Sequence, residues 1–146
     1  MRLKRMPVTT EKPPADIGRH MLVDFFDCPA HVDADGLAQR LTAAAKAAGA
    51  TILGGGQHDF AENDRATAFL MLAESHISAH TWPEHGVVAI DIFMCGETNA
   101  DAALQSLRSS FQPARETVVT HARGAIGTSA PSHPDSTGSA DDRGLS

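Results

Sequence analysis

The sequence has 146 residues, 42% of them hydrophobic and 21% charged, which is typical of one soluble globular domain. Its formal net charge of -6 disfavours a nucleic-acid partner or an anionic membrane surface, because both would repel an acidic protein. It contains no apolar run of about 18 residues and no signal-peptide pattern after Met1, so we expect a cytoplasmic protein that binds neither nucleic acid nor a membrane.

The two ends of the chain lack hydrophobic periodicity. Residues 1–17 are charged and include Pro7, Pro13 and Pro14, and residues 126–146 consist largely of Ser, Gly, Pro and Asp. Such segments bury too little apolar surface to fold. We therefore predict disordered tails on either side of one folded domain, residues 18–125.

The first predicted elements are a strand over 19–26, a helix from the N-capping Asp33 to about Ala48, and a strand that resumes at 51–53. The helix has a buried stripe at helical spacing, formed by Leu37, Leu41, Ala44, Ala45 and Ala48. Glycines 54–56 lack the lysine and the spacing of a phosphate-binding loop. We interpret them as a bulge or flexible bend that interrupts the strand.

The second half of the domain begins with a buried strand over 67–72. Residues 87–95 alternate strictly, with Val88, Ile90, Ile92 and Met94 on one face. A second helix is predicted from Asn99 to Phe111, with Thr98 and Asp101 as a capping box, and a last strand covers 116–123. One strand, a helix, four strands, a helix and a strand predict an α+β two-layer sandwich, in which helices cover one face of a largely antiparallel sheet.

Residues 74–86, ESHISAHTWPEHG, are unusually rich in groups that can do chemistry. Pro83 disfavours a helix, and histidines four apart in a strand lie about 13 Å apart, so we predict no metal site. A hairpin that turns at 83–86 places Ser75 opposite Met94 or Cys95. His80 has the opposite parity to Ser75, so uniting them in one strand requires a bulge or a break.

This segment resembles the prokaryotic-type S-adenosylmethionine decarboxylase proenzymes. The resemblance rests on Glu74-Ser75-His76 through His80-Thr81-Trp82-Pro83-Glu84, on Cys95-Gly96-Glu97 and on Gly18-Arg19-His20, and it extends over residues 18–123. It implies a pyruvoyl-dependent enzyme that cleaves itself between Glu74 and Ser75. The products would be a β chain, residues 1–74, and an α chain, residues 75–146, which begins with the pyruvoyl group.

The resemblance also implies roles for single residues. Ser75 would become the pyruvoyl group and form a Schiff base with the substrate, His80 would accept a proton during processing, and Cys95 would be the proton donor in catalysis. Glu84 matches an acceptor for ribose hydroxyls and Phe60 an aromatic residue that stacks on adenine.

Thr67 falls where related sequences carry a processing serine. The implied product is decarboxylated S-adenosylmethionine, the aminopropyl donor for spermidine biosynthesis. The implied assembly is a homodimer of αβ units.

Other interpretations of these residues stay open at this point. The same scaffold could carry a pyruvoyl-dependent arginine or ornithine decarboxylase, or a non-processing regulatory paralogue. A Ser-His hydrolase is less favoured, because the sequence has no G-x-S-x-G elbow. Cys28 reads as a small buried hydrophobic residue, His76 and His85 as structural or substrate-proximal, and the role of Asp91 is open.

Overall fold

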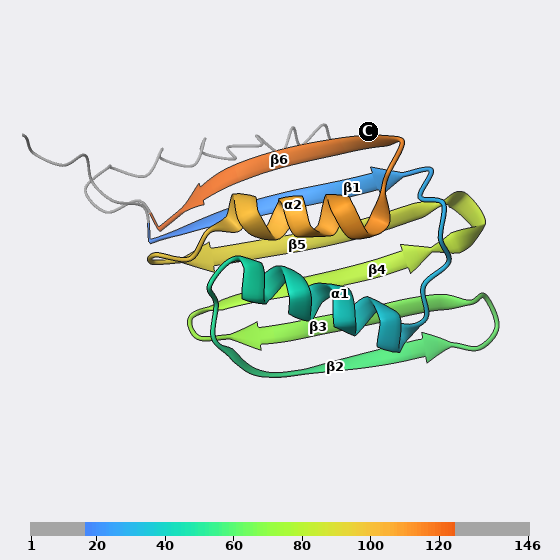
Figure 1. Ribbon diagram of the computed structural model, residues 1–146, viewed down its shortest axis with the longest axis horizontal. Coiled ribbons are helices and arrows are strands. Elements are labelled where there is room, and N and C mark those ends of the chain that lie inside the picture. Colours follow the sequence, from blue (N-terminus) through green and yellow to red (C-terminus); the bar gives the residue numbers. More distant parts are fainter. Residues whose placement is uncertain (1–16, 125–146) are drawn as a thin grey trace, which may run out of the picture.

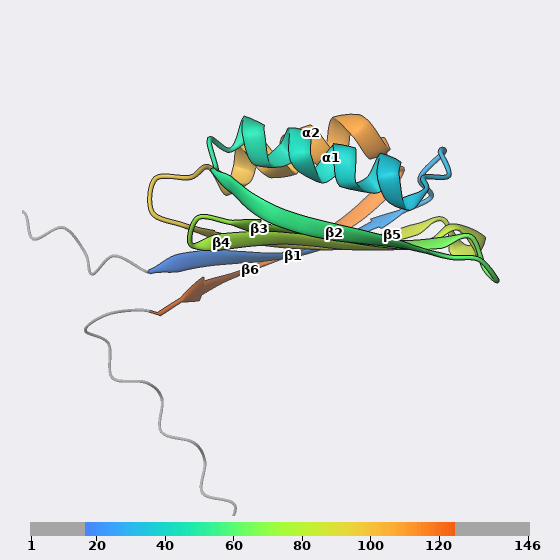
Figure 2. The same cartoon turned by 90° about the horizontal axis from the view of Figure 1, so that it is seen from below.

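The protein is described here by a computed structural model that covers residues 17–124, so both predicted tails lie outside the described residues except for Ile17. Within this range six antiparallel strands form one sheet, and two helices lie together on one of its faces (Figure 1 and Figure 2). The elements in chain order are β1 (Gly18–Phe26), α1 (Ala34–Ala47), β2 (Ile52–Phe60), β3 (Arg65–Leu72), β4 (Ser75–Trp82), the short turn η1 (Pro83–His85), β5 (Val87–Cys95), α2 (Ala100–Phe111) and β6 (Arg115–Arg123). The predicted α+β sandwich is confirmed.

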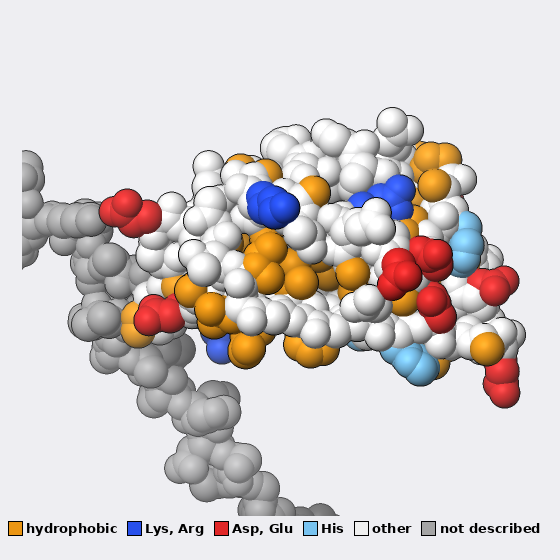
Figure 3. Space-filling view, turned by 60° about the horizontal axis from the view of Figure 1, so that its bottom comes forward, with side chains coloured by type: hydrophobic (Ala, Val, Ile, Leu, Met, Phe, Trp, Pro, Cys, Tyr) orange, Lys and Arg blue, Asp and Glu red, His pale blue; other side chains and the backbone are white. Residues whose placement is uncertain are grey.

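The sheet has the strand order β2-β3-β4-β5-β1-β6, and the core lies between it and the helices. The predicted stripe of α1 is buried, one face of α2 is buried as well, and the alternating side chains of β5 point into the same core. Asp33 caps α1 as predicted, because its carboxylate accepts from the Gly36 N–H at 2.8 Å. Asp59 of β2 accepts from the Ala34 N–H at 2.7 Å, which ties this helix end to the sheet. Acidic side chains gather at one end of the molecule in Figure 3.

The glycine run does not end the strand, although the predicted bulge has a counterpart where the run begins. β2 continues through Gly54–Gly56 to Phe60 and pairs with β3, and only a register shift between Ile52 and Gly54 marks an irregularity. A Cβ atom at Gly55 would lie 2.4 Å from the carbonyl oxygen of Phe69. Glycine therefore allows a close backbone approach within the strand instead of ending it.

The predicted capping box of α2 is wrong. The N-cap is Asn99, whose side chain accepts from the Ala102 N–H at 3.0 Å, while the Thr98 hydroxyl donates to the Cys95 carbonyl at 2.7 Å. Asparagine caps helices at least as well as threonine, so the helix begins one residue later than the box requires.

The second face of the sheet is not covered by any described element (Figure 2). Large apolar side chains on this open face are about half exposed: Leu22 by 41%, Phe69 by 51%, Met71 by 53% and Val119 by 49%. The strand registers also place histidines on it, namely His20, His58, His76, His80 and His121. Neither helix within the described residues is long and apolar enough to cross a membrane.

Candidate active site

Ser75 and Cys95 meet where β4 begins and β5 ends. The backbone N–H of Cys95 donates to Ser75 Oγ at 3.1 Å, and Ser75 is buried. The ladder pairs Trp82 with Val87 and His76 with Phe93 without a shift, which is one of the two predicted registers. The predicted hairpin is confirmed, and it holds the Ser75 hydroxyl oxygen against a peptide N–H group.

Glu74 lies in a strained backbone conformation directly before Ser75. Its φ of 59° is in the left-handed region, and it belongs to the two-residue turn Ala73–Glu74 between β3 and β4. Tight hairpin turns normally use Gly or Asn at such a position, and another residue type there costs on the order of 1–2 kcal/mol. The strain is therefore located at the peptide bond that the sequence motif marks for cleavage.

His80 lies away from Ser75 on the same strand. It points to the open face, where its Nδ1 lies 2.9 Å from the Thr67 hydroxyl across the β3–β4 ladder. β4 keeps one register with both neighbours, so the bulge or break that would unite the two residues does not form. Five residues of strand span about 16 Å, and Ser75 faces the helices. Within one protomer, the predicted processing base is therefore far from the predicted cleavage site.

The remaining predicted residues gather around His80. A hollow of about 260 Å³ is lined by Phe60, Asn63, Arg65, Ala66, Thr67, His80, Thr81 and Trp82. Phe60 is 46% exposed at this hollow, and the Trp82 ring lies 6.1 Å from that of His80. Phe60, Thr67 and His80 therefore share one site, as the resemblance implies.

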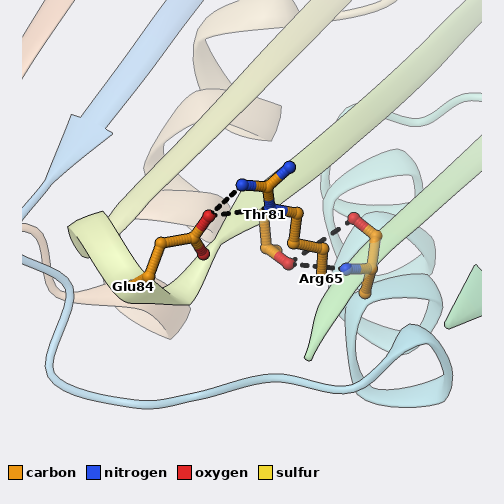
Figure 4. Close-up of polar contacts among 4 residues, drawn as sticks. Arg65, Thr81 and Glu84 are labelled. Carbon is orange, nitrogen blue, oxygen red and sulfur yellow. Dashed lines mark hydrogen bonds and ion pairs between the residues drawn. The ribbon is translucent and has the colours of Figure 1, made fainter. Parts of the chain in front are cut away.

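Arg65, which lines this hollow, forms an ion pair with Glu84 (Figure 4). The Arg65 Nε donates to Glu84 Oε1 at 2.7 Å, and Nη2 donates to the same oxygen. The hydrogen bond from Arg65 lowers the pKa of Glu84 below its ordinary value. Thr81 lies next to the pair in Figure 4 and fixes the strands, because its hydroxyl accepts from the Ala66 N–H at 2.9 Å. Neither Arg65 nor Trp82 was among the predicted site residues.

Asp91 has a partner on the open face. Its carboxylate lies 3.2 Å from His20 Nε2, and Arg123 donates to His20 Nδ1 at 3.2 Å. Because a guanidinium only donates, the His20 proton is on Nε2 and points to Asp91. The His76 ring lies 6.0 Å from that of His20, and burial, followed by the effect of His20, lowers the pKa of His76.

Cys28 packs against the hydrophobic core but is only half-buried, unlike the buried residue that was predicted, and burial raises the pKa of its thiol. Within residues 17–124 no three histidine, cysteine or acidic side chains come together as metal ligands.

Comparisons with known proteins point to one family. The profile of the S-adenosylmethionine decarboxylase family matches residues 19–124. An S-adenosylmethionine decarboxylase proenzyme of Parasynechococcus marenigrum is 41% identical over 110 residues, which cover 73% of this chain and 85% of that protein. One of Methanococcus aeolicus is 35% identical over 113 residues, covering 75% and 96%.

A solved structure is similar as well. The adenosylmethionine decarboxylase of Aquifex aeolicus superposes with a TM-score of 0.67 at 30% identity, and the match covers 80% of this chain and 98% of that one. These names favour S-adenosylmethionine over arginine or ornithine. The chain belongs to the S-adenosylmethionine decarboxylase family.

Proposed function

We propose that the protein is a self-processing, pyruvoyl-dependent S-adenosylmethionine decarboxylase. The observation that carries the proposal is the hydrogen bond from the Cys95 N–H to Ser75 Oγ, directly after the strained Glu74, in a chain of this family. The product, decarboxylated S-adenosylmethionine, would be the aminopropyl donor for spermidine, made in the cytoplasm.

Processing begins with the Ser75 hydroxyl. Its oxygen attacks the carbonyl carbon of Glu74, the peptide C–N bond breaks, and the protonated amine remains on residue 75 as an ester forms. A base then removes the α-proton of residue 75, and the Glu74 carboxylate leaves with the Ser75 oxygen. The resulting dehydroalanine tautomerises to an imine, which takes up water and loses ammonia to leave the pyruvoyl group. The position of Ser75 fits this chemistry, since its oxygen already accepts a fixed N–H bond and its amide follows a strained turn.

A pyruvoyl group at position 75 supplies a carbonyl that takes up the substrate amine and withdraws electrons as carbon dioxide leaves. The protein must then return a proton to the substrate carbon. Cys95 is the candidate donor, because its backbone N–H contacts position 75 and a thiol can act as a general acid.

The separation of Ser75 from His80 leads us to infer an active site shared by two protomers. The Thr67–His80 pair and the hollow with Phe60 and Arg65 lie at one end of the open face, and Cys95 lies toward the other. Two open faces stacked in antiparallel fashion would bring His80 of one copy toward the strand ends of the other that carry Ser75 and Cys95. The half-exposed Phe69, Met71 and Val119 favour such stacking, because it removes their apolar surface from water.

Intact mass spectrometry of the purified protein tests the proposal. We expect two chains divided between residues 74 and 75, the second blocked by a pyruvoyl group, and release of carbon dioxide from S-adenosylmethionine. Ser75→Ala should remain a single inactive chain. A wild-type protein that stays uncleaved after long incubation would instead support a non-processing regulatory paralogue, and a cleaved Ser75→Ala protein would exclude the mechanism.

A further inference from the structure

The ion pair of Arg65 and Glu84 uses only part of each group. Two N–H groups of Arg65 converge on Oε1, while Oε2 of Glu84 and Nη1 of Arg65 take no part in the pair. The two side chains remain 39% and 35% exposed. Arg65 lines the hollow together with Phe60 and Trp82, and its ion pair holds Glu84 next to this lining residue (Figure 4).

We propose that Arg65 is a further substrate-binding residue, which together with Glu84 clamps the vicinal diol of a ribose. This inference rests on the proposed function and on the role of ribose acceptor that the resemblance implies for Glu84. Each hydroxyl both donates and accepts hydrogen bonds, a carboxylate only accepts, and a guanidinium only donates. Glu84 can accept hydrogen bonds from both hydroxyl groups, and Arg65 can donate one to a hydroxyl oxygen.

Arg65 also prepares Glu84 for the ligand. Glu84 lies on the three-residue turn η1, where a half-exposed side chain has several accessible rotamers. Two bonds to one guanidinium hold the carboxylate in one orientation before the ligand arrives, so less entropy is lost on binding. The lowered pKa of Glu84 keeps it an acceptor at lower pH than an isolated glutamate.

The same chain contains a matched ion pair outside the hollow. Arg108 of α2 donates through Nε and Nη2 to both oxygens of Glu116 in β6, and the two side chains are 33% and 30% exposed. Arg108→Ala therefore removes an Arg–Glu pair of similar exposure without changing the site. It separates the role of Arg65 in binding from the general effect of losing an Arg–Glu pair.

The test is titration calorimetry with 5′-methylthioadenosine and its 2′-deoxy analogue. We expect the wild type to prefer the ribose form. Arg65→Ala should weaken binding of the ribose form by about five- to tenfold and that of the deoxy form by less than about twofold. Arg65→Lys, which keeps the charge but not the fork, should fall between wild type and Arg65→Ala, and Arg108→Ala should bind both ligands like the wild type.

Two results would overturn the clamp: an equal loss for both ligands in Arg65→Ala and Arg65→Lys, or a wild type without preference for the ribose form. Failure of the proposed function is seen separately, by mass spectrometry of the wild type and by carbon dioxide release. An uncleaved wild type that still prefers ribose through Arg65 would exclude self-processing and support the clamp.

Discussion

Co-expression of two inactive variants tests whether the active site is shared. A base must come within about 3 Å of the group it deprotonates, directly or through one water, whereas Ser75 and His80 of one chain lie about 16 Å apart along β4 and on opposite faces. A His80→Ala chain keeps its own Ser75. In a shared site it obtains the base from a Ser75→Ala partner, which keeps its own His80.

The expected extent of cleavage follows from the assembly. Equal amounts of the two variants that associate at random place about half of the chains in mixed dimers, and each mixed dimer has one complete site. We expect up to about half of the His80→Ala chains to be cleaved on co-expression and almost none when this variant is expressed alone. Intact mass spectrometry distinguishes the chains if one carries a short tag. An uncleaved His80→Ala chain in verified mixed dimers would refute the shared site.

Three further predictions concern residues near the cleavage site. Cys95→Ala should still be cleaved, because the N–H that contacts Ser75 belongs to the backbone, but should lose about 100-fold or more in carbon dioxide release; full turnover would remove Cys95 from its role. Glu74→Gly releases strain of on the order of 1 kcal/mol and should slow cleavage about fivefold relative to Glu74→Gln, measured as a time course of the mass spectrum; equal rates would show that the strain is not used. The pKa of His76 is lowered in the folded protein, so on acidification the unfolded chain takes up this proton first and unfolding is favoured. The urea midpoint of uncleaved Ser75→Ala should therefore fall as the pH drops below 6.5. Adding His76→Gln should reduce this dependence of the midpoint on pH, and an unchanged dependence would contradict the assignment.

Local patterns predicted most of the fold. Each helix or strand buries one face, and neighbouring residues in the sequence are enough to show which face that is. Examples are the spacing of Leu37 and Leu41 and the alternation over 87–95. The course of β2 through Gly55 depends on close contact with the Phe69 backbone, which no local pattern indicates. Thr98 and Asn99 are both good caps one residue apart, so the sequence does not choose between them.

The sequence predicts only part of the site, because some of its contacts join strands that are distant in the sequence. The motif and the β4–β5 register predict the contact between Ser75 and Cys95. The residues that surround His80 depend instead on the β3–β4 register, which is set by the turn at Ala73–Glu74. Counting back from that turn pairs Thr67 with His80 and brings Arg65 close to the turn that carries Glu84, so this signal was present in the sequence. The partner of Asp91, His20, comes from β1, and Arg123, which contacts His20, comes from β6; the places of both strands in the sheet depend on the long crossover connections.

The strand order has a consequence for the cleaved protein. Residues 1–74 supply β1, β2 and β3, and residues 75–146 supply β4, β5 and β6, yet β1 is inserted between β5 and β6. The two product chains are therefore interleaved, and three backbone ladders, β3 with β4, β5 with β1 and β1 with β6, still join them after the cut. The proposed cleavage would open one two-residue turn and would not cut any strand of these ladders. The new chain end at position 75 can form without the halves separating, and neither half has a complete sheet alone.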